Sequence, residues 1–222
     1  MKILKSLIVI LFLVQNTGCT QLMAFDIKGK LKDLTGQKDS ASGDFDLSSG
    51  KTELMQTFNE SSGNYLKALE LIMKAYGLNV QAAQVTATIE NYGENSNASE
   101  ADQMKNSIKA TTEASEALKK KMEVDGEMVS AEGKVYYAKS LPPAGKGLMG
   151  TIKLAPVSSK MVSAVSSNPL SALKEIGGLS KVIPQLPAYM KTIQDLTKLI
   201  ISGAKANDIE GASDMESQLG DL

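Results

Sequence analysis

The feature that most constrains the fold is a run of apolar residues spaced at threes and fours between Leu54 and Tyr76. Its members are Leu54, Met55, Phe58, Tyr65, Leu66, Leu69, Ile72, Met73 and Tyr76. This spacing places them on one face of a helix, and no segment of the chain alternates apolar and polar residues between turn signals. The sequence therefore predicts an all-α fold: a helical bundle of about four to six helices with one long helix.

This first helix is expected to begin at a cap formed by Ser49 or Thr52 and to end at Gly77. A second helix should cover residues 80–89. Residues 93–98 are rich in Gly, Asn and Ser, and they predict a loop.

A long helix is expected next, because Ser99-x-x-Asp102 has the pattern of a capping box. Residues 104–122 carry a thin, partly polar stripe, and the helix can continue from there to Ser140. Pro142 and Pro143 should end it, since proline has no amide to donate and its ring clashes with the preceding turn.

Three shorter segments complete the expected bundle. Residues 157–165 and 170–176 should be helical, the second after an Asn-Pro start typical of a helix N-terminus. A last helix should cover 187–203. The tail, 204–222, holds five acids and one lysine and is expected to be either frayed or a short packed helix.

The N-terminus has the pattern of a secretory leader. Lys2 and Lys5 precede an unbroken apolar run over residues 7–14, and Cys19 is the only cysteine in the chain. A bilayer-spanning helix takes about 20 residues, so this run is too short to span but suits the apolar part of a signal peptide. Cleavage is expected near Cys19.

The residues Thr17-Gly18-Cys19 resemble the end of the lipobox of bacterial lipoproteins, although Asn16 stands where the family usually has leucine. The resemblance implies that Cys19 is acylated on its thiol and becomes the mature N-terminus, anchoring the protein to a membrane. Thr20 is not the aspartate that resembles an inner-membrane retention signal. The outer membrane is therefore expected, with the body facing the periplasm or the cell surface.

Two alternatives stay open for this leader: ordinary cleavage near Ala24, or a buried N-terminal helix that ends in a core cysteine. With lipidation, the chain divides into a signal peptide (1–18), a lipidated N-terminus and tether (19–51), a helical bundle domain (52–203) and an acidic tail (204–222).

Composition restricts the possible functions. Removal of the leader leaves 22 lysines (24 minus 2) against 25 acids, a balance that argues against nucleic-acid binding. The chain has no Arg and no His, so it lacks the bidentate phosphate fork and the commonest metal ligand and general base. The sequence predicts no nucleic-acid partner, no cofactor and no metal site.

One glycine motif matches a known string. Gly145-x-Gly147-x-x-Gly150 has the spacing of a dinucleotide fingerprint, but that motif requires a strand before it and a helix after it. Because Pro142-Pro143 precedes it here, a flexible connection between helices is expected instead.

Other candidate catalytic groups are weak. Two Ser-x-x-Lys pairs occur, Ser171 with Lys174 and Ser202 with Lys205. The further motifs of Ser-Lys acyl enzymes are missing. The acids Glu123, Asp125 and Glu127 follow three lysines and favour a solvated helix face over a glycosidase pair. No catalytic residue is predicted.

Two further features have ordinary explanations. Residues 39–46 contain acids, but without the spacing of a calcium loop. Ten methionines follow the leader, and core packing is expected for them in preference to an adaptable binding surface.

The expected function is that of a non-catalytic cell-envelope lipoprotein, an accessory protein that binds an envelope or secretion assembly. Its partners would be the membrane, through the acyl anchor at Cys19, and an unidentified envelope protein. The alternative is a membrane-active, pore-forming-like helical protein, because residues 148–165 are small and carry few charges. An enzyme of unfamiliar type also stays open.

Overall fold

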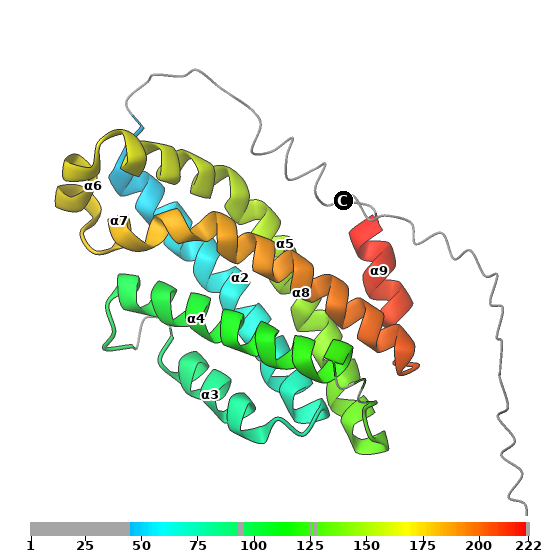
Figure 1. Cartoon of the computed structure of the whole chain (residues 1–222). Helices are drawn as coiled ribbons and strands as arrows, with labels where there is room; N and C mark the ends of the chain where they lie inside the picture. Colours follow the sequence, from blue (N-terminus) through cyan, green and yellow to red (C-terminus); the bar gives the residue numbers. More distant parts are fainter. Residues whose placement is uncertain (1–44, 93–95, 125, 127, 221–222) are drawn as a thin grey trace, which may run out of the picture.

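The computed structural model describes residues 45–92, 96–124, 126 and 128–220, and in these residues the chain is all-helical (Figure 1). The helices are α2 (Leu47–Ala75), α3 (Asn79–Glu90), α4 (Glu100–Lys119), α5 (Ala131–Ser167), α6 (Pro169–Ile176), α7 (Leu179–Val182), α8 (Leu186–Ala206) and α9 (Ala212–Gly220). A π-helical turn, Lys120–Val124, follows α4, and a 3-10 turn, Ile183–Gln185, precedes α8. The predicted helical bundle with one long helix is confirmed, since α5 has 37 residues.

The centre of the bundle is the antiparallel pair of α2 and α5, the most extensive contact between two elements (Figure 1). Small residues allow the two backbones to approach closely. A Cβ on Gly147 would lie 2.9 Å from the backbone nitrogen of Tyr65, and one on Gly150 would lie 2.9 Å from the Cα of Ser61. Ser61 Oγ donates a hydrogen bond of 2.8 Å to the carbonyl oxygen of Gly147, so a hydroxyl also links the pair.

Helix α8 packs on this pair and is joined to it by two buried tyrosines. Tyr137 of α5 donates to the carbonyl oxygen of Ile200 at 2.8 Å. Tyr65 of α2 lies 2.8 Å from Thr197 Oγ1 and 3.1 Å from the carbonyl oxygen of Ile193. Both rings are fully buried, so these hydrogen bonds satisfy hydroxyls that have no access to water.

The predicted position of the long helix is wrong. Helix α4 ends at Lys119, and the chain turns near Gly126, whose φ of +61° favours glycine. The long helix starts at Ala131, capped by Ser130 Oγ, which accepts from Gly133 N at 3.0 Å. It continues through Pro142, Pro143 and Pro156 to Ser167.

Packing against α2 explains why the prolines do not end α5. Pro142 and Pro156 are exposed and Pro143 is half-buried, whereas the opposite face of α5 buries Leu141 and Leu148 against α2. Pro142 and Pro156 therefore lie on the side of α5 away from the α2 contact, where water can replace a lost helical amide. Tertiary contacts outweigh the local cost of the prolines.

Other helix ends agree with the sequence more closely. Ser99 caps α4 as expected, accepting from Asp102 N at 3.2 Å, and Asn168 caps α6, accepting from Ser171 N at 3.2 Å. The cap of α2 differs from the expectation, because Asp46 serves in place of Ser49 or Thr52. The first helix thus includes residues assigned to the tether. In the tail, α9 is a short packed helix.

Candidate binding groove between α3 and α4

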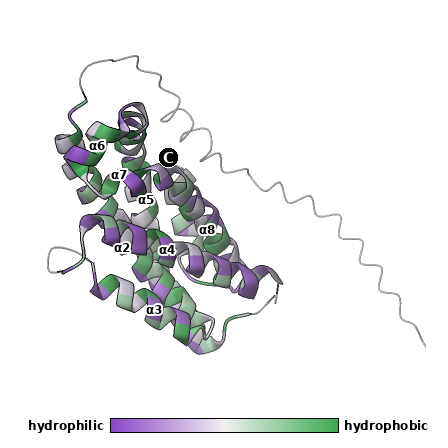
Figure 2. Cartoon of the chain, turned by 60° about the vertical axis from the view of Figure 1, so that its left-hand side comes forward, coloured by the Kyte–Doolittle hydropathy of each residue, from purple (hydrophilic) through white to green (hydrophobic). Residues whose placement is uncertain are grey.

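Helix α3 lies on the surface of the bundle and buries few of its residues. Only Ala82 and Val85 are buried among its 12 residues, and no residue between Asn79 and Ile89 carries a charge. Figure 2 shows hydrophilic residues along α4 and a mixture of hydrophobic and hydrophilic residues along α3. A surface segment such as 79–89 without a charge is unusual, because solvent-facing positions are normally rich in Lys and Glu.

A groove of about 340 Å³ lies between α3 and α4. Side-chain amides dominate its polar lining: Gln81, Gln84, Asn91, Gln103 and Asn106. Val85, Tyr92, Ala110 and Ala114 add apolar surface, and Lys109 and Glu113 are its charged residues. The groove therefore presents neutral groups that both donate and accept hydrogen bonds, beside a small apolar surface.

Several buried hydroxyl groups lie near Tyr92 inside the bundle. Ser62 Oγ donates to the carbonyl oxygen of Phe58 at 2.6 Å, so in its hydrogen bond with Tyr92 the tyrosine must be the donor. Burial raises the pKa of Tyr92 to about 12, which keeps the phenol protonated and able to donate. The hydroxyls of Ser107, Thr111 and Tyr189 are also buried here, with Ser107 beside Tyr92 and Thr111 beside Tyr189.

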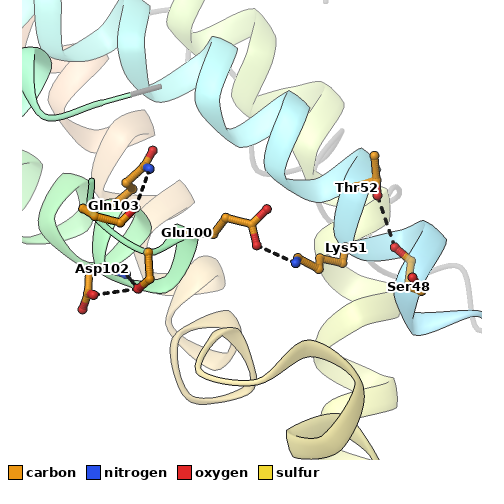
Figure 3. Close-up of polar contacts among 8 residues, drawn as sticks. Ser48, Lys51, Thr52, Glu100, Asp102 and Gln103 are labelled. Atoms are coloured by element: carbon orange, nitrogen blue, oxygen red, sulfur yellow. Dashed lines mark hydrogen bonds and ion pairs between the residues drawn. The ribbon is translucent and has the colours of Figure 1, made fainter. Parts of the chain in front are cut away.

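The start of α4, at one end of the groove, is fixed by polar contacts (Figure 3). Lys51 Nζ of α2 lies 2.6 Å from Glu100 Oε2 of α4. Gln103 Nε2 donates to the carbonyl oxygen of Ala98 at 3.0 Å. Asp102 Oδ2 accepts from Ser99 Oγ at 2.6 Å, which completes the cap of α4. This wall of the groove is therefore held in place before a ligand arrives.

The sequence predicted a flexible connection at the glycine string, and this prediction is wrong. The string lies in the middle of α5. Its amides belong to the helix, and Gly147 and Gly150 contact α2 while a Cβ on Gly145 would meet nothing within 4 Å. These glycines serve helix packing.

The two Ser-x-x-Lys pairs have other partners. Ser171 Oγ donates to Glu175 Oε1 at 2.7 Å, and Lys205 Nζ lies 2.6 Å from Glu216 Oε2 of α9. Lys174 and Ser202 are exposed. Neither serine is hydrogen-bonded to the lysine of its own motif, so the structure does not assemble a Ser-Lys nucleophile there.

The candidate acids that the structure describes have ordinary structural roles. Glu123 Oε2 lies 3.8 Å from Lys119 Nζ on an exposed face, while Asp125 and Glu127 lie outside the described residues. Asp46 caps α2, and its hydrogen bonds with Ser49 and Ser48 lower the pKa of the carboxyl. Among the described residues, no group of three His, Cys, Asp or Glu side chains is arranged to hold a metal ion. Cys19 lies outside the described residues.

Six methionines pack the core, as predicted, whereas Met128 is 60% exposed. Met55, Met73, Met104, Met161, Met190 and Met215 are buried. The amide-lined groove was not predicted. The sequence does contain one sign of the groove, the absence of charged residues over 79–89. The apolar periodicity of this segment predicts a helix but does not indicate a groove.

No family model, no curated protein and no solved structure matches this chain. Within the described part of the chain, no helix has the length and apolar character needed to cross a membrane.

Proposed function

We propose that this protein is a non-catalytic lipoprotein of the bacterial cell envelope that binds a segment of a partner protein in the groove between α3 and α4. The observation that carries the proposal is the groove itself: about 340 Å³ between α3 and α4, lined by five side-chain amides, with no charged residue on its α3 side.

The chemistry of the groove suits a peptide segment. Each Gln or Asn side chain offers donors and an acceptor, which match the carbonyl and amide groups of an extended backbone. Gln84, Asn91 and Asn106 are exposed at the groove, so a partner can reach them without movement of the bundle. The apolar surface beside them, including Val85, would bury a side chain of the partner.

The leader supports membrane attachment. Acylation of Cys19 would tie the chain to the membrane, and residues 20–44 would join the anchor to the bundle. Two acyl chains give stable attachment where a single chain gives a reversible one. A tethered protein meets membrane-bound partners at a raised effective concentration, which makes a modest groove useful.

The bundle supports this function over pore formation. The low-charge stretch 148–165 buries Leu148, Leu154 and Met161 in the core, so its small residues serve packing against α2. Release of that stretch into a bilayer would require α5 to leave the core. Leakage of dye from liposomes on addition of the mature protein would favour the membrane-active alternative.

A photo-crosslinking experiment tests the groove. A photoreactive residue replaces Gln84 in the groove or, as control, Lys191, which is exposed on α8. Irradiation of living cells should give one discrete adduct from position 84 and none from position 191. Adding Asn106→Lys should abolish the adduct. Equal adducts from both positions, or an adduct that Asn106→Lys leaves unchanged, would contradict the proposal.

The anchor is tested separately by the intact mass of protein taken from membranes. A diacyl or triacyl increment on a chain that begins at Cys19, absent from a Cys19→Ala variant, is expected. An unmodified chain that begins near Phe25 would contradict the anchor while leaving the groove experiment valid.

A further inference from the structure

Four lysines of α5 lie at intervals of seven residues: Lys139, Lys146, Lys153 and Lys160. All four are exposed. Seven residues are close to two helical turns, so each lysine is rotated by only about 20° from the last. Over 21 residues at 1.5 Å each, the four form a nearly straight row of about 31 Å. We call them the lysine row.

The lysines of the row form no ion pair with a described residue, unlike several lysines elsewhere in the bundle. Four lysines of α2, α4 and α8 pair with an acid one turn away at 2.6–3.8 Å, as in Lys74 with Glu70 and Lys191 with Asp195. No lysine of the row has a carboxylate of a described residue within 4.0 Å. After Glu132, α5 carries no acid at all. The positive charge of the lysine row is therefore available to an external anion.

The residues between the lysines of the row are uncharged. Three residues after each lysine stand Pro142, Met149, Pro156 and Ser163. Three of these are exposed and Met149 is half-buried. A seam in which cations alternate with Pro, Met and Ser is suited to a surface that offers phosphates beside apolar groups.

Helix α6, at the C-terminal end of α5, exposes two leucines. Leu170 is 74% exposed and Leu173 is 47% exposed, and they lie three residues apart on one face. Helix α6 packs against α2 and α5, and Phe45 and Met161 meet beside Gly50, so the start of α2 lies at the same end (Figure 1). A membrane anchor on the N-terminal segment would enter the bundle at this end.

We propose that the lysine row and the α6 leucines dock this protein on a membrane surface that carries anionic lipid headgroups. The lysines bind headgroup phosphates, and Leu170 and Leu173 enter the interfacial region. Charge complementarity points to an anionic surface, and the exposed leucines beside the chain entry point to a lipid one. This docking goes beyond the proposed groove, and its choice of a lipid surface rests in part on the proposed anchor. The test below removes the acyl site, so the docking and the anchor can fail separately.

Acids near the middle of the row limit its strength. Glu60, Glu210 and Asp214 line the same hollow as Lys146 and Lys153, so they lower the local positive potential. Neutralising the two on the C-terminal segment, with Glu210→Gln and Asp214→Asn, should strengthen membrane binding several-fold. A decrease would count against the proposal.

The test is vesicle flotation of the mature chain with Cys19→Ala, which removes the acyl site. Lys→Gln at all four positions of the row is compared with Lys→Gln at Lys74, Lys109, Lys119 and Lys191, which changes the net charge equally. With vesicles containing phosphatidylglycerol, the row variant should lose on the order of a hundredfold in partitioning, at roughly fivefold or less per lysine. The control variant should lose little, and circular dichroism verifies that both fold.

Three outcomes would overturn the proposal: equal losses in both variants, equal binding to vesicles of phosphatidylcholine alone, or binding to polyglutamate without binding to anionic vesicles. The last would assign the row to an acidic protein instead.

The leucines are tested by fluorescence. The chain has no tryptophan, so Leu170→Trp introduces a single reporter, and Val80→Trp on α3, where Val80 is 71% exposed, is the control. Anionic vesicles should shift the emission of the reporter at position 170 to the blue and leave position 80 unchanged. An unchanged emission at 170, or an equal shift at both positions, would overturn the docking as stated.

Discussion

Residues without a side chain determine how closely the two central helices pack. Gly147 and Gly145 are two positions apart on α5, yet only Gly147 meets α2, where a Cβ would lie 2.8–2.9 Å from atoms of Tyr65. The sequence marks both glycines as part of one string and cannot separate them, because which face a residue presents depends on the helix partner. The role of Gly147 required the structure.

Substitution of these glycines should have opposite effects. Gly147→Ala should lower the free energy of unfolding by about 1–3 kcal/mol, since a methyl group must be inserted into a filled contact. Gly145→Ala meets nothing within 4 Å and should raise it by up to about 1 kcal/mol through helix propensity. Urea unfolding followed by circular dichroism measures both. Equal effects would mean that α2 and α5 are not in close contact at position 147.

At the scale of elements, the sequence predicted most helices and misplaced the longest one. Helices α2, α3, α6 and α8 follow from apolar spacing and from cap or breaker residues, which are local signals. The breakers misled most at Pro142 and Pro143, where α5 continues because its buried face packs on α2. A local rule for proline cannot include that packing, which joins residues far apart in the chain. The groove depends in the same way on how α3 and α4 meet.

Proline in α5 carries a measurable cost. Pro156 is exposed and offers no amide to the carbonyl of Ile152. Pro156→Ala should restore this hydrogen bond and raise the free energy of unfolding on the order of 1 kcal/mol, below the roughly 3 kcal/mol of a mid-helix proline because the helix has adapted to it. Ser159→Ala, on the exposed face nearby, is the control and should change little. Destabilisation by Pro156→Ala would mean that the proline shapes α5.

At the scale of the whole molecule, buried tyrosine hydroxyls make the free energy of unfolding depend on pH in the alkaline range. Tyr65, Tyr137 and Tyr189 are fully buried, and burial raises the pKa of each above its usual value. For Tyr92 burial raises the pKa to about 12. A raised pKa in the folded state contributes stability that is complete below the unfolded value of about 10. This contribution is lost as the pH rises toward the folded value.

Stability should therefore fall between about pH 10 and pH 12, measured by urea unfolding at a series of pH values. Tyr92→Phe should flatten part of this decline, because the phenylalanine has no proton to lose. Tyr136→Phe, at a half-buried tyrosine of α5, is the matched Tyr→Phe control. A decline of the same slope in Tyr92→Phe would show that Tyr92 ionises freely in the folded protein.

The hydrogen bond between Ser61 and Gly147 joins residues 86 positions apart. The central pair of helices can therefore form only after a long stretch of chain, including α3 and α4, has looped back on itself. Loop closure of that length costs entropy before any contact compensates for it. The bundle is thus expected to fold more slowly than up-and-down bundles of similar size, whose neighbouring helices are consecutive in sequence. Until α5 has packed on α2, the apolar face of α2 stays exposed and can contact other molecules.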